Sequence, residues 1–266
     1  MAVRLDSLVV QKKLISSREK AKEHILAGHV TVNEIVCNKP SQQVDENADV
    51  LISGEILKYV GRGGLKLEKA IDYFKLDLND KICADIGAST GGFTDCMLQN
   101  GAKKVYAVDV GHDQLALKLL EDKRVVNLEG VNVRYLTDEQ ISEKLNFISV
   151  DVSFISLTLI LPVLKRFLAN NGEMVCLIKP QFEAGKSHVG KKGVVKSQAS
   201  HIEVLNKIIS FVEEQNFNIK CLTYSPIKGP EGNIEYLIYL KNEDKSKFIF
   251  DIKSFVSSVF ISFKKT

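Results

Sequence analysis

From residue 82 to residue 240, short apolar runs alternate with stretches of helical pattern, and no other feature of this 266-residue sequence restricts its fold as strongly. The runs that read as strands are Ile82–Ile86, Val105–Val110, Arg124–Leu128, Phe147–Val152, Met174–Ile178, Ile219–Tyr224 and Glu235–Leu240. The clearest helical stretches are Gly92–Asn100, Asp113–Leu120 and Ser200–Gln215. Such alternation predicts an α/β domain, a mostly parallel sheet wrapped by helices, whose ligands bind at the carboxyl ends of the strands.

The first part of the chain has a different pattern, with basic residues and short elements. Ser16-Ser-Arg-Glu19 has the spacing of a capping box ahead of a helix, and Gly28 follows as its stop signal. Val30–Asn33 and Val50–Ile52 read as short strands. We therefore expect a small α+β module over residues 1–58, a glycine-rich linker over 59–64 and the sheet domain over 65–266.

Composition narrows the class of protein. The net charge of +3 is mild, so a polyanionic partner would have to be met by local basic patches. The five cysteines are odd in number and lack metal-type spacing, which favours a reducing cytoplasm and predicts no disulfide framework and no metal site. The longest apolar run, Leu157–Leu164, is far shorter than the roughly 20 residues that span a membrane. We expect a soluble cytoplasmic protein.

The stretch ADIGASTGGFTD, residues 84–95, follows the first predicted strand and opens a helix. In dinucleotide enzymes, a glycine loop of this kind holds a pyrophosphate at the helix N-terminus, and Asp85 would repel that group. S-adenosylmethionine has no phosphate and carries an ammonium and a sulfonium, so an acid at this turn attracts it. Asp109 ends the next predicted strand 24 residues later, a position from which a carboxylate can accept hydrogen bonds from both hydroxyls of a ribose.

These acids and glycines together predict S-adenosylmethionine as the cofactor. Asn132, just past the third predicted strand, is a candidate for recognising the adenine edge. The residues expected to bind the cofactor are Asp85, Gly87, Ala88, Ser89, Thr90, Gly91, Gly92, Phe93, Asp109, Val110, Asn132 and Asp151. The alternative is that the acids are helix caps or turn residues of an ordinary doubly wound sheet, for instance that of an NAD-dependent oxidoreductase.

A second set of residues makes the resemblance to a known family specific. It consists of Lys66 in RGGLKLEKA, Asp151 in SVDVSF, Lys179 in LIKPQFE and Glu235 in NIEYLIYL. With the glycine loop, these residues resemble the Lys-Asp-Lys-Glu tetrad of FtsJ-type RNA 2′-O-methyltransferases. The N-terminal pattern, RLD followed by LISSR and IxxGxVxVN, resembles an S4 RNA-binding module. The combination resembles the TlyA family, sometimes labelled hemolysins, whose members methylate ribosomal RNA.

The resemblance implies a Rossmann-like class I methyltransferase sheet behind a small S4 domain, and it implies a role for each tetrad residue. Lys179 would be the general base that takes the ribose proton, kept partly unprotonated by burial and by the nearby cation of Lys66. Asp151 would orient the Lys179 amine, and Glu235 would hold Lys66 or the ribose. Lys69, one helical turn from Lys66, is an alternative, and any of these residues could instead be an ordinary surface, turn or edge-strand residue.

Basic residues gather in three places, which favours RNA as the partner because phosphate contacts supply affinity and register. They lie in the N-terminal module, near the glycine-rich linker and in the acid-free segment 184–197, which resembles a mobile RNA-contacting flap. The residues expected to bind RNA are Arg4, Arg18, Lys20, Lys22, Lys39, Arg62, Lys186, Lys191 and Lys192. The alternative for any single cluster is a solvated surface.

The expected function is S-adenosylmethionine-dependent 2′-O-methylation of a cytidine in bacterial ribosomal RNA, in the large-subunit RNA, with the small-subunit RNA left open as a further target. The expected partners are ribosomal RNA and ribosomal subunits, and the sequence identifies no protein partner. A noncatalytic S4-type assembly factor is one alternative. A membrane-active hemolysin is another, and its best support is the apolar segment Phe248–Phe263, which reads either as a membrane-surface helix or as a helix that covers the core.

Overall fold

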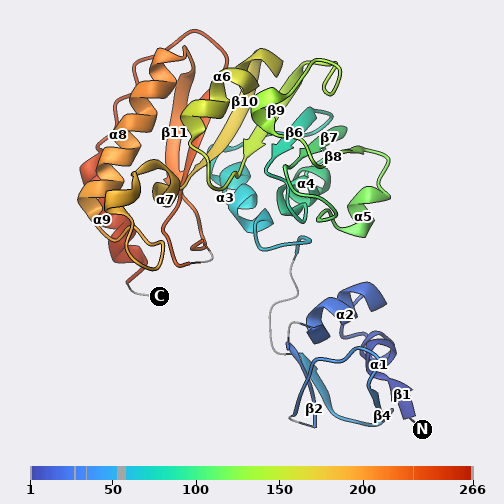
Figure 1. Cartoon of the computed structure of the whole chain (residues 1–266). Helices are drawn as coiled ribbons and strands as arrows, with labels where there is room; N and C mark the ends of the chain where they lie inside the picture. Colours follow the sequence, from blue (N-terminus) through green and yellow to red (C-terminus); the bar gives the residue numbers. More distant parts are fainter. Residues whose placement is uncertain (1, 27, 34, 53–57, 230, 265–266) are drawn as a thin grey trace. The chain divides into compact units, whose positions relative to one another are not determined.

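The computed structural model describes residues 2–26, 28–33, 35–52, 58–229 and 231–264. The chain divides into two compact units, Met1–Lys58 and Tyr59–Thr266 (Figure 1). The segment 59–64, expected to be a linker, belongs to the second unit, where Tyr59 is only 3% exposed. The two units are described separately below.

The first unit is a small α+β fold. Its elements are β1 (Ala2–Arg4), α1 (Leu5–Gln11), α2 (Arg18–Leu26), β2 (Val30–Val32), β3 (Ile35–Cys37), β4 (Gln43–Asp45) and β5 (Val50–Ile52). β1 pairs with β4, and β2 lies between β3 and β5, all antiparallel. Leu5, Val9 and Ile25 from the two helices are fully buried against the sheet residue Val30. The hydroxyl of Ser17, one residue after the predicted cap Ser16, accepts from the Lys20 amide of α2 at 3.3 Å.

The second unit is built on a seven-stranded sheet in the order β11-β12-β10-β9-β6-β7-β8. The strands are β6 (Ile82–Ile86), β7 (Lys104–Val108), β8 (Val125–Leu128), β9 (Leu145–Val150), β10 (Leu168–Ile178), β11 (Asn218–Tyr224) and β12 (Tyr236–Lys241). All neighbours are parallel except β12, which is antiparallel to both β10 and β11. The chain leaves β6 in one direction through β7 and β8 and then returns to β9 on its other side. The predicted doubly wound α/β sheet is therefore confirmed, with its switch point between β6 and β9, where ligands of such sheets bind.

Helices cover both faces of the sheet (Figure 1). They are α3 (Gly64–Phe74), α4 (Gly92–Gln99), α5 (Leu117–Leu120), α6 (Leu157–Phe167), α7 (Pro180–Glu183), α8 (Gln198–Glu214) and α9 (Ile252–Ser262), with short 3₁₀ turns at Val133–Tyr135 and Lys186–His188. Alternate residues of β10 enter two separate cores, since Cys176 packs with residues of α6, α8 and α9, whereas Val175 packs with residues of α3 and α4. This alternation follows from the two-residue period of a strand, and it explains why Met174–Ile178 of β10 is a continuous apolar run.

Several element boundaries differ from the sequence prediction. α5 begins at Leu117 and not at Asp113, because Asp113 adopts a left-handed conformation with φ of 55°. The apolar run from Leu157, noted above only for its length, forms α6 with Pro162 inside it. α9 begins at Ile252 because the Asp251 carboxylate accepts from the Ser254 amide at 3.1 Å.

The C-terminal segment lies against the core of the second unit. Val256 and Val259 of α9 are buried, α9 packs on α8, and the rings of Phe248 and Phe250 stack ahead of the helix at 5.5 Å. This arrangement agrees with the prediction of a helix that covers the core. In the described residues, no helix has the length and apolar character needed to cross a membrane.

Candidate active site

A cavity of about 870 Å³ opens near the carboxyl ends of β6, β7 and β9, within the size range of roughly 300–1,000 Å³ common for small-molecule sites. Six of the residues expected to bind a cofactor line it, namely Gly87, Ser89, Asp109, Val110, Asn132 and Asp151. Gln114, Arg134, Ser153, Phe154, Leu159 and Phe182 are among the other lining residues. The switch point of the sheet and the predicted glycine loop therefore meet at one cavity.

The shape of the glycine loop is fixed by close contacts along the cavity wall. Gly87 has a φ of 86°, and a Cβ at this position would lie 2.5 Å from the backbone oxygen of Asp151, so a larger residue would push β6 and β9 apart. Asp109 accepts hydrogen bonds from the Ser89 amide at 2.7 Å and from the Gly111 amide at 2.8 Å. The Asp109 carboxylate thus joins the loop after β6 to the loop after β7.

Asp85 does not lie on the cavity wall. It is fully buried and accepts from the amide and the hydroxyl of Thr94, at 2.8 and 2.7 Å, and from the hydroxyl of Ser149 at 3.2 Å. Burial raises the pKa of Asp85 to about 7, although the hydrogen bonds from Thr94 and Ser149 act in the opposite direction. In this structure Asp85 stabilises the start of α4 and does not line the cavity, and its contact with a methyl donor stays a prediction.

The remaining predicted residues of the loop are buried, except Thr90, which is exposed. Ala88, Thr90, Gly91, Gly92 and Phe93 do not line the cavity. A Cβ on Gly92 would lie 2.9 Å from the backbone nitrogen of Gly64, so this glycine permits the close approach of α3 to α4. Ala88, Gly91, Gly92 and Phe93 therefore shape the loop through packing.

Asp95, the last residue of the loop motif, ties segment 59–64 to α4. Its carboxylate accepts hydrogen bonds from the amide of Val60 at 2.9 Å and from the Lys118 ammonium at 2.8 Å. Asp95 itself is only 4% exposed. The glycine-rich segment is therefore held against α4, the helix that follows the glycine loop.

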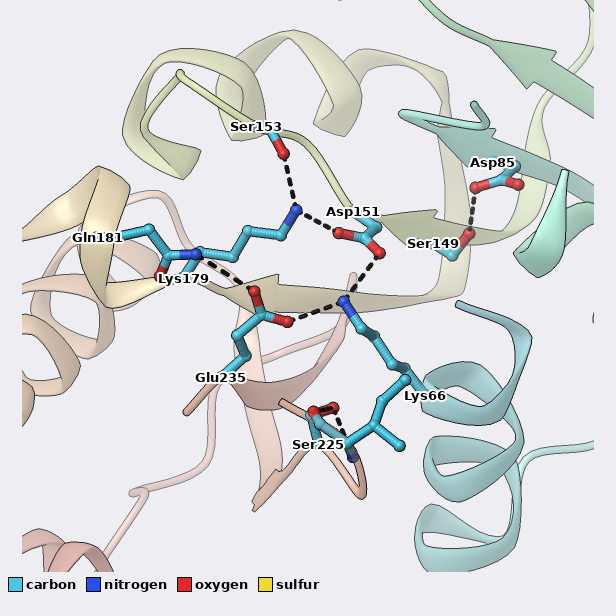
Figure 2. A network of polar contacts seen from close by, with 10 residues as sticks. Lys66, Asp85, Ser149, Asp151, Ser153, Lys179, Gln181, Ser225 and Glu235 are labelled. Atoms are coloured by element: carbon cyan, nitrogen blue, oxygen red, sulfur yellow. Dashed lines mark hydrogen bonds and ion pairs between the residues drawn. The ribbon is translucent and has the colours of Figure 1, made fainter. Parts of the chain in front are cut away.

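The predicted tetrad forms one connected polar network (Figure 2). The Lys66 ammonium lies 2.8 Å from Glu235 and 3.4 Å from Asp151, and the Lys179 ammonium lies 2.6 Å from the other oxygen of Asp151. These residues come from α3, the start of β12 and the ends of β9 and β10. Because Asp151 also lines the cavity, the network opens toward it.

The two lysines of the network have different surroundings. Lys66 is 7% exposed, and although burial acts to lower its pKa, the charges of Asp151 and Glu235 outweigh burial and raise it above the usual value. Within the described residues, Lys179 contacts a single carboxylate, that of Asp151, and it donates to the hydroxyl of Ser153 at 3.0 Å. Lys69, the alternative to Lys66, lies instead over the rings of Tyr73 and Tyr224, at 5.3 and 5.6 Å.

Several residues of this site were not singled out from the sequence. Gln181 donates to Glu235 at 3.3 Å, and Ser153 accepts from Lys179. Phe154, with a φ of 64° and an exposure of 91%, and Phe182 lie 4.9 Å apart between ring centroids on the cavity wall. The one signal available was proximity, because Ser153 and Phe154 follow Asp151 and because Gln181 and Phe182 follow Lys179 in the quoted motifs.

The residues predicted to bind RNA are mostly exposed, and two of them are also tied to an acid. Arg4 and Arg18 both pair with the buried Asp6, at 2.8 and 3.2 Å. The hydrogen bond from Arg4 is the main reason why the pKa of Asp6 lies well below its usual range. The side chains of Lys22, Lys39, Arg62, Lys191 and Lys192 are exposed, Lys20 is half-buried, and the side chain of Lys186 lies outside the described part of the structure.

The segment 184–197, expected to be a flap, is attached at its second half. The Asn233 side chain accepts from the Val195 amide at 3.0 Å and donates to the Gly193 carbonyl at 2.9 Å. In the described residues, no group of three or more His, Cys, Asp or Glu side chains is arranged to hold a metal ion.

Known proteins share both units of this chain. The FtsJ-like methyltransferase family matches residues 59–242, and the S4 domain matches residues 3–50. The "16S/23S rRNA (cytidine-2'-O)-methyltransferase TlyA" of Mycobacterium tuberculosis is 38% identical over 90% of this chain and 90% of its own length. This chain belongs to the TlyA family.

Two further relatives agree with this membership. The "Putative rRNA methyltransferase YqxC" of Bacillus subtilis is 51% identical over 89% of this TlyA-family chain and 85% of its own length. The solved structure titled "Putative hemolysin from Streptococcus thermophilus" is 45% identical, covers 99% of this chain and 98% of its own, and has a TM-score of 0.78. The predicted family and the predicted class I methyltransferase sheet behind an S4 domain are therefore confirmed.

Proposed function

We propose that this protein transfers a methyl group from S-adenosylmethionine to the 2′-hydroxyl of a cytidine in bacterial ribosomal RNA. One observation carries the proposal: Asp151 lines the cavity and pairs with both Lys66 and Lys179, so a carboxylate common to the two amines stands beside the space for a small ligand. The names of the M. tuberculosis and B. subtilis relatives, both called rRNA methyltransferases, support the choice of substrate.

The residues around the cavity fit S-adenosylmethionine. Asp109 would accept hydrogen bonds from the ribose hydroxyls, Asn132 would recognise the adenine edge, and Gly87 leaves room for backbone approach. The absence of a Cβ at Gly87 keeps the loop close to Asp151, whose carboxylate favours a cation nearby. When bound, this cofactor supplies an activated methyl group on a sulfonium.

Lys179 is the better candidate for the general base. Lys66 pairs with two carboxylates and holds its proton, whereas Lys179 shares the single charge of Asp151 with Lys66 and has a neutral hydroxyl as its other partner. In our proposal the Lys179 Nζ takes the proton of the ribose 2′-hydroxyl, Asp151 stabilises the resulting ammonium, and Glu235 keeps Lys66 in place. Alignment of the reacting groups contributes the larger share of the acceleration, as much as roughly 7–11 kcal/mol in well-oriented systems.

The RNA would be bound by basic residues in both units. In the first unit we propose contacts from Arg4, Arg18, Lys20, Lys22 and Lys39, and in the second from Arg62 and the lysines of segment 184–197. Contacts of this kind hold structured RNA by its backbone and shape, while the target nucleotide leaves the stack to reach the cavity. We propose cytoplasmic ribosomal subunits as the place of action and large-subunit RNA as the target.

The test is mass-spectrometric mapping of ribose methylation on ribosomal RNA from cells with the wild-type protein, with Lys179→Ala and without the protein. We expect a 2′-O-methylated cytidine in large-subunit RNA that depends on the protein and on Lys179. A second mark in small-subunit RNA would extend the target and leave the mechanism intact. Equal methylation with the wild type and with Lys179→Ala would contradict the assignment of the base.

The other functions make different predictions in the same system. A noncatalytic assembly factor would bind RNA without leaving a methyl mark, and an oxidoreductase would bind NAD in preference to S-adenosylmethionine in calorimetry. A membrane-active protein would bind RNA-free liposomes. The packing of α9 through Val256 and Val259 against α8 disfavours that last function, because the apolar face of the helix is already used.

A further inference from the structure

Two short segments that follow the active-site strands are joined to each other at three points. The segment 153–157 follows Asp151 after β9, and the segment 179–183 follows β10. Lys179 donates to the Ser153 hydroxyl at 3.0 Å, and the ring of Phe154 lies 4.9 Å from that of Phe182. At the far end, the carboxylate of Glu183 accepts from Ser156 and from the Leu157 amide.

Glu183 is the anchor of this connection. It is 6% exposed, and it accepts from the Ser156 hydroxyl at 2.6 Å with one oxygen and from the Leu157 amide at 2.8 Å with the other. The Lys207 ammonium, 3.6 Å away, supplies a nearby positive charge. The Leu157 amide lies in the first turn of α6, where backbone amides lack partners within the helix, so its bond to Glu183 fixes the point at which the segment after Asp151 enters that helix.

Ser153 decides how the Lys179 amine is oriented. A neutral lysine amine has two N–H donors and one lone pair. The ion pair with Asp151 and the hydrogen bond to Ser153 hold the Lys179 nitrogen from two sides, so together they restrict the direction of the lone pair. Because Ser153 and Asp151 both line the cavity, the hydroxyl helps to determine whether the lone pair meets a substrate there.

We propose that Glu183 and Ser153 act as a pair of positioning residues for Lys179, a role that rests on the function proposed above. Only Phe154 and Ile155 separate Ser153 from Ser156, and Phe154 holds a left-handed turn with φ of 64°, so a shift at Ser156 is passed to Ser153. Glu183 therefore acts on the base through the segment that carries Ser153. It touches neither the cavity nor Lys179 in any contact of the described residues.

The test is a double-mutant cycle in single-turnover methyl transfer to ribosomal RNA at saturating cofactor. Ser153→Ala and Glu183→Ala should each lower the rate roughly 10- to 100-fold, the cost of a small misplacement of a reacting group. The double variant should be no slower than the slower single variant, because both substitutions remove the same restraint on the orientation of the Lys179 amine. Cofactor affinity measured by calorimetry should stay within about twofold of the wild type for Glu183→Ala, because Glu183 does not line the cavity.

Matched variants separate positioning from folding. Ser153→Thr keeps a hydroxyl, and Glu183→Gln keeps an acceptor for the Leu157 amide, so both should recover most of the rate. If Glu183→Ala does not fold, the methyl-transfer rates of the remaining variants test the positioning role. Ser153→Ala is then compared with Ser153→Thr, and Glu183→Gln with the wild type. Independent, multiplying losses in the double variant, or unchanged rates in Ser153→Ala, would overturn the proposal.

The outcome also separates this inference from the proposed function. Suppose that the wild type methylates RNA, that Lys179→Ala is inactive and that Ser153→Ala is fully active. Then the proposed function stands and only the positioning role is wrong. If the wild type leaves no methyl mark on any ribosomal RNA, the proposed function fails and this inference fails with it.

Discussion

Replacing Asp85 with asparagine tests the role that the structure gives this residue. Its carboxylate is fully buried and accepts hydrogen bonds from Thr94 and Ser149. An asparagine has nearly the same shape, can accept from the Thr94 amide and can donate to the Ser149 hydroxyl, and it carries no charge at any pH. The substitution therefore removes the titration while keeping most of the packing.

The pKa of Asp85 sets both the direction and the size of the effect. Burial raises this pKa from 3.8 to about 7, a rise of about three units, and each unit corresponds to about 1.4 kcal/mol. Between these two pH values the unfolded chain has lost the proton that the folded chain still binds, so stability falls as pH rises. The free energy of unfolding of the wild type should therefore fall by up to about 4 kcal/mol between pH 4 and pH 7, because Asp85 ionises in the unfolded chain and stays protonated in the folded one. The Asp85→Asn variant should show no such loss from this position.

Urea unfolding of both proteins, followed by circular dichroism from pH 5 to pH 8, measures this difference. We expect Asp85→Asn to gain about 2 kcal/mol relative to the wild type between pH 5 and pH 7, with no further gain above pH 8. Ser149→Ala is the matched control, since it perturbs the same buried cluster without removing a titrating group. A difference between wild type and Asp85→Asn that stays constant across this pH range would refute the reasoning.

Three further predictions concern the site and its substrate. Lys66→Met should lower the free energy of unfolding by about 3–5 kcal/mol in urea, because the buried carboxylate of Glu235 loses its cation, and adding Glu235→Gln should restore part of the loss. Asp109→Ala should weaken binding of S-adenosylmethionine by roughly 10- to 100-fold in calorimetry, since the loops after β6 and β7 lose their common acceptor. Cofactor affinity equal to that of the wild type would show that the carboxylate is dispensable. RNA affinity should fall steeply with salt, and Lys22→Gln should reduce the slope of log affinity against log salt by about one, whereas a flat salt dependence in the wild type would exclude backbone contacts.

The order of elements in the sheet could be read from local sequence because strands and helices repeat with different periods. Ile82–Ile86 and Val50–Ile52 were predicted with the bounds that the structure has. α5 and α9 were predicted too long, because the left-handed turn at Asp113 and the cap at Asp251 depend on individual backbone and side-chain contacts. Periodicity carries no information about such contacts, and boundaries are therefore the weakest part of a prediction from sequence.

The choice between Lys66 and Lys69 shows where sequence reasoning reaches its limit. The two residues lie one turn apart on α3, and only the packing of that helix decides which one meets Glu235, 169 residues away in the sequence. The resemblance to a known family favoured Lys66, whereas the spacing of the two lysines in the sequence could not distinguish them. The same holds for Gln181, whose position beside Glu235 depends on the pairing of β10 with β12.

The sequence by itself determined the two-part organisation, the alternating elements and the residue types that a methyl donor and a base require, because these depend on local periodicity and on chemistry carried by short motifs. Only the tertiary structure decided which polar groups meet. It turned Asp85 away from the cavity toward Thr94, brought Asp151 between two lysines, and tied Ser153 to Glu183 through the intervening loop. The physical reason is that hydrogen bonds and ion pairs act over a few ångströms, and strand pairing and helix packing determine which distant residues come that close.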